Sequence, residues 1–208
     1  MTIKEKMSLE SKAWVLEKLN LDKGYFERLS SMHTPNILWI ESSDSLIPVR
    51  ELTNTEPGEI LVYRNMASQV RADDISFMAT LEDAIEISRV EYIIICGYSH
   101  CGGIRDVILG TDDRPHVKKW LTGLQELYEN NEAELQDLDF DKKEKRLCEL
   151  NIKEQILNLS RLEMVQKAWE KSNDPILLGW YFDLTDGSIK EIFSMESNYK
   201  LKQVASLV

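Results

Sequence analysis

Two residues with reactive side chains, His100 and Cys101, stand side by side in the stretch YIIICGYSHCGG at positions 92–103. Strand-forming residues lead into a glycine, and a Gly-Gly pair then opens a helical pattern. Such a turn lies at the mouth of a parallel sheet, where α/β proteins place their chemistry. Imidazole and thiolate bind zinc, and a thiol beside a base can act as a nucleophile. The pattern therefore indicates a metal ligand or a nucleophile.

Buried strands must position this turn. Continuous apolar runs are typical of parallel strands that are covered on both faces, and they occur at 37–41, 60–64, 92–96 and 176–184. A helical repeat joins the second run to the third, and an Asp-Gly turn after the fourth predicts a returning edge strand. Residues 142–171 form one long amphipathic stretch. The predicted fold class is α/β, with a central, mostly parallel sheet of four strands plus an edge strand, flanked by helices.

The composition is that of a soluble, cytoplasmic single domain. The chain has 208 residues and a formal net charge of −11, which argues against nucleic acid or an anionic membrane as a partner. It has neither the apolar core of a signal peptide nor a run of about 20 apolar residues. Cys96, Cys101 and Cys148 have no framework spacing, so reduced thiols are expected.

Several segments together resemble the β-class carbonic anhydrases over residues 33–193, in the family's order and spacing: ILWIESSDSLIP, ILVYRNMASQV, EYIIICGYSHCGG and GWYFDLTDG. The resemblance implies a C-x-D-x-R motif after the first strand and an H-x-x-C motif after the third. In the family, two cysteines and the histidine of these motifs hold zinc, and the Asp-Arg pair controls its fourth position. Zinc-bound hydroxide attacks CO2 to give bicarbonate. The resemblance also implies a homodimer or homotetramer in which residues 1–30 form a helical arm on a partner subunit.

The chain departs from these motifs at three positions. Ser42 stands in place of the first cysteine, Leu46 in place of the arginine and Tyr98 in place of the histidine, whereas Asp44 and Cys101 match. A serine hydroxyl is not ionised near neutral pH and an ordinary tyrosine has a pKa of about 10, so neither readily binds zinc. We expect no zinc cofactor in the usual site and little or no carbonate dehydratase activity, as in a pseudoenzyme.

Two enzymatic alternatives stay open at this stage. A rearranged zinc site could use Cys101 and Asp44 with either His100 or His33, which stands where the family has a pocket glutamine. A metal-free cysteine hydrolase could use Cys101 as nucleophile, a histidine as base and Asp44 to orient that base. The simpler interpretation is that Ser42 and Tyr98 fill the space of the metal with hydrogen bonds and that His100 lies on the surface.

A second anion site is also conceivable from the resemblance. Trp39 and Arg64 match positions at which one branch of the family binds a regulatory bicarbonate. The tyrosine that completes that site would fall at Phe182, with Tyr181 beside it. The simpler interpretation is that Arg64 pairs with a carboxylate across a subunit contact.

Overall fold

The computed structural model describes residues 1–31, 34–110 and 113–197. The chain divides into two compact units, residues 1–34 and residues 35–208. His33, a predicted pocket residue, lies outside the described residues. No helix among the described residues has the length and apolar content that a membrane crossing requires.

The N-terminal unit consists of α1 (Ile3–Leu21) and α2 (Tyr25–Ser31). Thr2 begins α1 in a capping box, because its hydroxyl accepts from the Glu5 backbone N–H at 3.3 Å while its own N–H donates to the Glu5 carboxylate at 2.8 Å. The rings of Trp14 and Phe26 meet edge to face at 5.9 Å. Neither helix contains a buried residue, so this unit has no core of its own.

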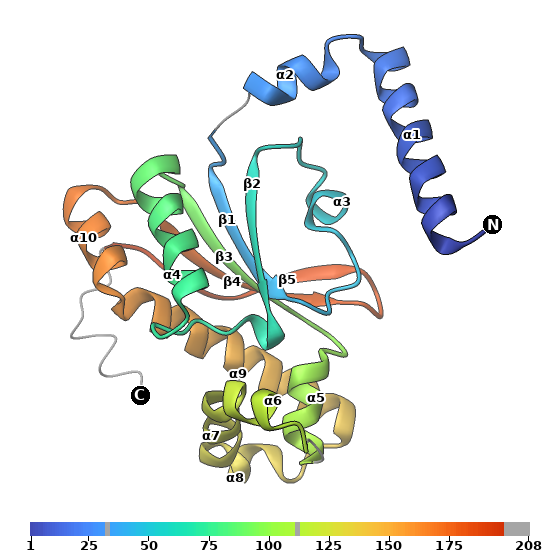
Figure 1. The fold of residues 1–208 in the computed structure, drawn as a ribbon. Coiled ribbons are helices and arrows are strands. Elements are labelled where there is room, and N and C mark those ends of the chain that lie inside the picture. Colours follow the sequence, from blue (N-terminus) through green and yellow to red (C-terminus); the bar gives the residue numbers. More distant parts are fainter. Residues whose placement is uncertain (32–33, 111–112, 198–208) are drawn as a thin grey trace. The chain divides into compact units, whose positions relative to one another are not determined.

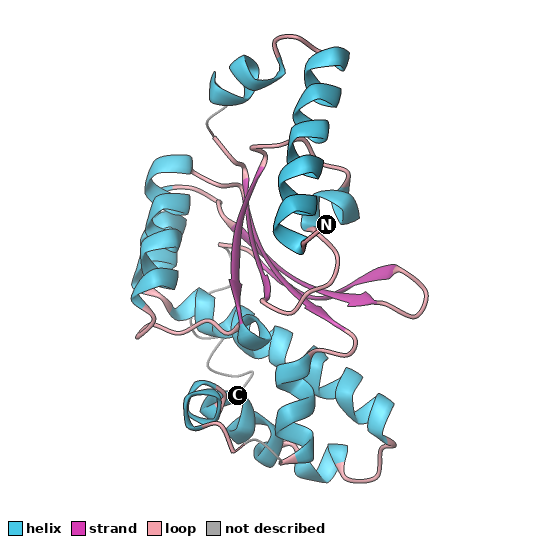
Figure 2. Ribbon diagram, turned by 45° about the vertical axis from the view of Figure 1, so that its right-hand side comes forward, coloured by secondary structure: helices cyan, strands magenta, loops and turns pink. Residues whose placement is uncertain are grey.

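The second unit is built on one five-stranded sheet (Figures 1 and 2). Its order is β2-β1-β3-β4-β5, with the first four strands parallel and β5 antiparallel to β4. The bounds are β1 (Ile37–Ser42), β2 (Ile60–Asn65), β3 (Tyr92–Tyr98), β4 (Ile176–Asp183) and β5 (Ser188–Met195). The predicted fold class is confirmed, including the edge strand.

Helices cover both faces of the sheet and the carboxyl end of β3. They are α3 (Val49–Thr53), η1 (Met66–Ser68), α4 (Ile75–Glu82), η2 (Asp83–Ser88), α5 (Gly102–Leu109), α6 (Pro115–Trp120), α7 (Thr122–Asn130), α8 (Glu132–Leu135), α9 (Phe140–Arg161) and α10 (Glu163–Lys171). In Figure 1 the group from α5 to α8 lies below the carboxyl end of β3. Helices therefore cover the turn that carries Cys101.

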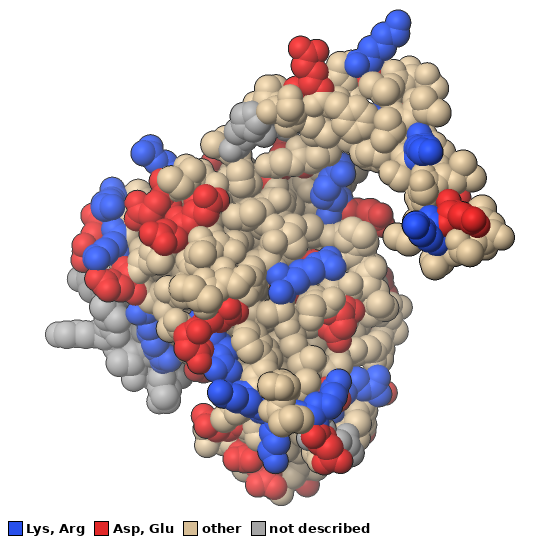
Figure 3. Space-filling view, viewed as in Figure 1, with Lys and Arg blue, Asp and Glu red and all other residues tan. Residues whose placement is uncertain are grey.

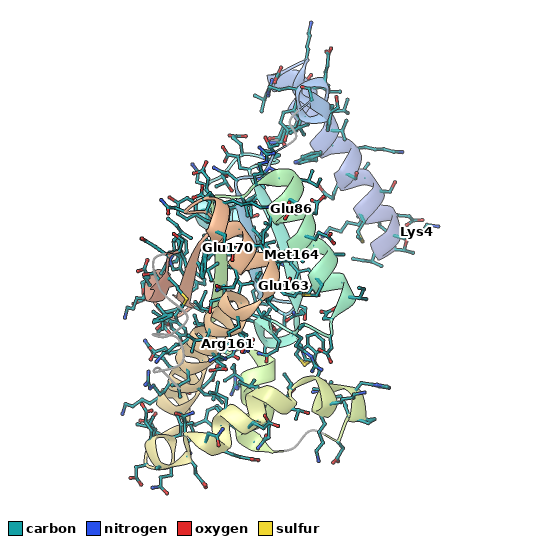
Figure 4. All side chains as sticks on the ribbon, turned by 90° about the vertical axis from the view of Figure 1, so that its left-hand side faces the viewer. Lys4, Glu86, Arg161, Glu163, Met164 and Glu170 are labelled. Carbon is teal, nitrogen blue, oxygen red and sulfur yellow. The ribbon has the colours of Figure 1, made fainter. Side chains whose placement is uncertain are left out.

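The predicted amphipathic stretch at 142–171 is two helices, α9 and α10, rather than one. Leu162 interrupts it with extended backbone angles. Before the break, the Ser160 hydroxyl donates to the Leu157 carbonyl at 2.8 Å, and the Gln166 side chain donates to the Ser160 carbonyl at 2.5 Å. These side chains satisfy backbone groups in place of helical hydrogen bonds. Exposed Glu163 and Glu170 on α10 and Glu86 on η2 are labelled in Figure 4.

Successive residues of the strands point to opposite faces of the sheet and pack in two apolar clusters. Leu38, Ile40, Ile93 and Ile95 pack in one with α4, η2, α9 and α10. Trp39, Ile94 and Cys96 pack in the other, which includes residues of α3. The sheet face that carries Ile95 also needs a glycine in β4 near α9, since a Cβ at Gly179 would lie 2.5 Å from a methyl group of Ile152.

On the side of the molecule that Figure 3 shows, acidic and basic side chains are interspersed and no extended basic surface is visible.

Candidate functional site

The candidate site lies where β1 and β3 end side by side. Ser42 is the last residue of β1, Tyr98 is the last residue of β3, and Cys101 precedes the first residue of α5. The strands are parallel neighbours, so their carboxyl ends meet at one edge. The structure thus brings together Ser42, Asp44, Tyr98 and Cys101, as the two motifs predict.

Ser42 is fully buried and is the centre of a hydrogen-bond network. Its hydroxyl donates to Asp44 Oδ1 and accepts from the Ala67 backbone N–H at 3.0 Å. The Cys101 thiol also points to this oxygen, with Sγ 3.7 Å from Ser42 Oγ. A hydroxyl has one donor and two acceptor positions, so its hydrogen-bonding capacity is used in full.

Asp44 is held as a carboxylate by its neighbours. Its Oδ2 accepts from the Gly102 backbone N–H at 2.8 Å. Burial favours the neutral acid, but hydrogen bonds from Ser42, Tyr98 and Gly102 outweigh that effect, and the pKa of Asp44 lies below its ordinary value. Residue 102 must lack a side chain, because a Cβ there would lie 2.8 Å from Asp44 Oδ2.

The other two site residues are neutral at physiological pH. Burial, and then the charge of Asp44, raise the pKa of Cys101 to about 11. Burial, followed by the hydrogen bond to Asp44, also raises the pKa of Tyr98 far above its usual value. Cys101 is therefore a thiol and Tyr98 a phenol, and each favours its uncharged form because the surroundings exclude water.

The residue beside Cys101 points elsewhere. His100 has a φ of +67°, in the left-handed region that few residues other than glycine adopt. Its side chain is 54% exposed, and its Nδ1 lies 3.8 Å from Glu144 Oε2 on α9. The structure does not bring the imidazole of His100 into the hydrogen-bond network of Ser42 and Asp44.

A second layer of polar residues, absent from the sequence predictions, supports the site. Ala67, whose N–H donates to Ser42, has a φ of +60°. Its carbonyl accepts from the side chains of Gln69 at 2.9 Å and Asn151 at 3.0 Å. Gln155 joins the same buried group by donating to Asn151 Oδ1 at 3.0 Å. These bonds hold the Ala67 carbonyl, and the Trp120 indole N–H, which donates to the Met66 carbonyl at 2.9 Å, holds the peptide plane of the Ala67 N–H. Polar positions inside the apolar pattern at 150–156 were the signal for Asn151 and Gln155.

The family model described as carbonic anhydrase matches residues 37–189, which contain the whole sheet edge just described. This chain belongs to the carbonic anhydrase family. A carbonic anhydrase of Emericella nidulans is 32% identical over 189 residues, which cover 90% of this chain and 82% of that protein. A carbonic anhydrase of Candida albicans is 29% identical over 199 residues, which cover 89% of this chain and 70% of that protein.

Solved structures assign the chain to the β class. A β-carbonic anhydrase of Sordaria macrospora, one of two named as tetrameric, superposes with a TM-score of 0.86 at 29% identity, over 93% of this chain and 100% of that one. A β-carbonic anhydrase of Aspergillus fumigatus gives a TM-score of 0.86 at 28% identity, over 97% of this chain and 95% of that one. The resemblance inferred from the motifs is thereby confirmed.

For a β-carbonic anhydrase, the residues at this edge are a poor set of zinc donors. Three protein ligands and an open position are typical of catalytic zinc, but here Cys101 is the one thiol at the edge, the Ser42 hydroxyl is fully engaged and Tyr98 offers a phenol in place of an imidazole. Within residues 1–31, 34–110 and 113–197, no group of three or more His, Cys, Asp or Glu side chains is arranged to hold a metal ion. The residues present do not fit zinc in the family's manner.

The space beside the site is also small. A cavity of about 10 Å³ lies among Glu41, Leu46, Cys96, Tyr98 and Phe182, with Ser45, Ile47, Leu52 and Leu184 completing its wall. That volume is about the size of one water molecule. Leu46, which stands at the family's arginine position, is 77% exposed and has no polar group to orient Asp44.

The structure does not unite the three residues considered for a second anion site. Trp39 and Arg64 belong to one face of the sheet, because Trp39 is two residues before Glu41, which pairs in register with Arg64. Tyr181 pairs with Gly97 and belongs to the opposite face, beneath α9. Arg64 instead forms an ion pair with Glu41 of its own chain, at 2.5 Å.

Proposed function

We propose that this β-carbonic anhydrase homologue has little or no carbonate dehydratase activity and serves as a non-catalytic member of its family. The observation that carries the proposal is the Ser42 hydroxyl, which makes three contacts, to Asp44, Ala67 and Cys101. Zinc at this position would have to deprotonate a saturated, fully buried hydroxyl and break its hydrogen bonds. Metal affinity falls when ligands must lose protons.

The two alternative enzymes have less support. A rearranged zinc site needs a third ligand beside Cys101 and Asp44, but His100 lies against Glu144. A cysteine hydrolase needs a thiolate, which is the nucleophilic form, but the pKa of Cys101 is raised to about 11. Neither requirement is met by the described residues, so the non-catalytic function is favoured.

We also propose that the protein acts as a homo-oligomer in the cytoplasm, with residues 1–30 packed on a partner subunit. The support is the N-terminal unit, whose helices bury no residue and expose apolar side chains such as Ile3, Met7 and Leu16. The Sordaria macrospora relative is tetrameric. Light scattering should give at least a dimer at micromolar concentration, and a monodisperse monomer would contradict the proposal. The three free cysteines agree with a reducing compartment.

CO2 hydration tests the proposed function directly. Stopped-flow measurements with a pH indicator, in the presence of added zinc, should give the same rate for the wild-type chain as for Cys101→Ala. The Cys101→Ala variant lacks the one thiol at the site and is otherwise matched. A wild-type rate that exceeds that of the variant would overturn the proposal, since the difference could only come from turnover at this edge.

A further inference from the structure

The carboxylate of Glu144 on α9 is buried without a close partner. Among the described residues, Glu41 and Glu144 are the two carboxylates with only 3% of the residue exposed. Glu41 is paired with Arg64 at 2.5 Å. By contrast, the side-chain nitrogens of His100 and Arg105 that approach Glu144 both lie 3.8 Å from its Oε2, and Oε1 has no hydrogen-bond partner. A buried polar atom without a partner is uncommon and calls for a cause.

The surroundings of Glu144 compensate its charge only in part. Burial raises the pKa of Glu144, and a hydrogen bond from the His100 backbone and the charge of Arg105 do not fully offset that rise. The Arg105 side chain is 43% exposed, and its guanidinium carbon lies 5.1 Å from the centre of the Phe140 ring. A further positively charged donor beside Oε1 would stabilise the carboxylate, because a buried charge is favourable only when it is paired and hydrogen-bonded.

Glu144 also lines a cavity of about 220 Å³ between α9 and the carboxyl ends of β3 and β4. The wall carries three carboxylates, two ammonium groups and one imidazole, which belong to Asp141, Glu144, Asp183, Lys142, Lys145 and His100. The volume corresponds to about seven water molecules of bulk liquid. The cavity therefore has room for a small organic molecule.

Both lysines of this wall are paired with other carboxylates. Lys145 Nζ lies 3.2 Å from Asp183 Oδ2. Lys142 Nζ lies 2.6 Å from Asp139 Oδ2, and Asp139 is not part of the wall. Neither ammonium group is thus committed to Glu144, and the buried carboxylate is left to attract a cation from outside the chain.

The donor that Oε1 lacks is a compact one. Because Oε2 faces His100 and Arg105, the carboxylate offers one oxygen rather than the two that a guanidinium binds side by side. A primary ammonium group carries three N–H donors on one charged atom. The terminal torsion of a glutamate is soft, so Oε1 can turn toward the cavity. A metal ion is disfavoured, since the described residues include no group of three or more His, Cys, Asp or Glu side chains placed to hold one.

We propose that this cavity binds the primary ammonium group of a small amine, with Glu144 as its counter-ion. The ammonium group donates to Oε1 and supplies the positive charge that the wall lacks there. The remainder of the ligand is short, because the volume leaves room for about six further heavy atoms. The inference is independent of zinc binding and of carbonate dehydratase activity, since the contacts of the Ser42 hydroxyl do not include Glu144.

Thermal unfolding of the whole chain in three salts tests the proposal. Methylammonium chloride should raise the melting temperature saturably above its value in sodium chloride at equal ionic strength, because a ligand that binds only the folded state stabilises it. At about ten times its Kd, the rise should be about 3–6 °C for a chain of this size. Tetramethylammonium chloride supplies the same charge without an N–H donor, so the melting temperature in it should equal that in sodium chloride.

Matched variants assign the effect to one carboxylate. Glu144→Gln keeps the shape of the side chain but removes its charge, so the response to methylammonium should be lost. Glu149→Gln makes the same change elsewhere on α9, where Glu149 pairs with Arg146 and is not part of the cavity wall, and it should keep the full response. If Glu144→Gln does not fold, Glu144→Asp retains the charge but withdraws it by one methylene. Isothermal titration calorimetry should then show methylammonium binding weakened by about tenfold or more, because a hydrogen bond to a charged group is lost.

Four outcomes would overturn the proposal. Equal melting temperatures of the wild-type chain in methylammonium and sodium chloride would mean that the cavity holds water alone. Equal stabilisation by methylammonium and tetramethylammonium would reveal a general effect of organic cations. An undiminished response in Glu144→Gln, or undiminished affinity in Glu144→Asp, would place the amine elsewhere. Loss of the response in Glu149→Gln would show that it follows the overall charge of α9 rather than this carboxylate.

Discussion

The Ser42 network and the Glu41–Arg64 pair begin at neighbouring residues of β1, yet they satisfy their polar groups in opposite ways. The Ser42 hydroxyl uses its full hydrogen-bonding capacity within the chain. At Glu41, a charged pair coexists with an indole N–H and a carboxylate oxygen that lack hydrogen-bond partners. A neutral hydroxyl can complete a buried network by rotation, whereas a buried charge needs a counter-charge and more donors than the sheet provides.

The largest expected effect is on zinc affinity, when the family's ligand types replace Ser42 and its neighbours. Ser42→Cys, Leu46→Arg and Tyr98→His together restore the ligand types that the family motifs contain. Zinc affinity should rise by several orders of magnitude, because thiolate and imidazole replace neutral oxygens. Equilibrium dialysis with elemental analysis measures it, and about one zinc per chain is expected.

A shifted variant provides the control for this triple change. Ser43→Cys in place of Ser42→Cys puts the same thiol on an exposed neighbour, so zinc should not bind with comparable affinity. If the original triple variant folds normally by circular dichroism but binds no zinc, the backbone at the two turns is not that of a zinc site. The interpretation of the chain as a carbonic anhydrase fold that has lost only its zinc ligands would then be wrong.

The next largest effect should be on stability at the charged pair. Glu41→Ala leaves Arg64 without its counter-charge, and breaking a buried pair typically destabilises a protein by about 3–5 kcal/mol. The exposure of Arg64 lets water solvate the remaining charge, so a loss of about 2–3 kcal/mol is expected by urea unfolding. Glu51→Ala on exposed α3 should change stability by less than about 0.5 kcal/mol. Similar losses for the two variants would contradict the assignment of Glu41 as a buried ion.

Loss of the Ser42 hydroxyl should lower the free energy of unfolding somewhat less than loss of Glu41. Ser42→Ala leaves the Ala67 N–H and the Cys101 thiol without their acceptor, and an unsatisfied buried group costs about 1–3 kcal/mol. Ser43→Ala, one residue away and exposed, should lie within about 0.5 kcal/mol of wild type. Urea unfolding of both variants decides the matter. A Ser42→Ala variant as stable as Ser43→Ala would mean that the network contributes nothing.

The strands and the site edge could be predicted from the sequence, because continuous apolar runs are typical of parallel strands and the carboxyl ends of parallel strands meet at one edge of the sheet. A surface position for His100 was the simpler interpretation of the sequence, but its positive φ could not be predicted, since such a φ at a residue other than glycine is set by its surroundings. The in-register pairing of Glu41 with Arg64 could not either, because a hydrophobic pattern fixes which residues share a face but not which partner a charge takes. The sequence favoured a partner across a subunit contact, whereas the structure supplies one within the chain.

The smallest effect concerns alkaline pH. The pKa of Cys101 is about 11 in the folded chain and about 8.5 in an unfolded one. The unfolded state therefore loses its proton first, so the stabilisation from the raised pKa is complete below pH 8.5 and declines as pH rises toward 11. The decline attributable to Cys101 should be about 1 kcal/mol at pH 9.5. Comparison with Cys101→Ala isolates it, and an equal slope in both chains would contradict a protonated thiol.

Zinc stoichiometry of the wild-type chain tests the central claim most directly. The protein is purified without chelators, dialysed against buffer with a small excess of zinc, and then analysed for zinc and protein in the same sample. The saturated Ser42 hydroxyl, and a tyrosine at position 98 in place of an imidazole, predict well under one zinc per chain, with the same value for Cys101→Ala. One zinc per wild-type chain that disappears in Cys101→Ala would contradict the account.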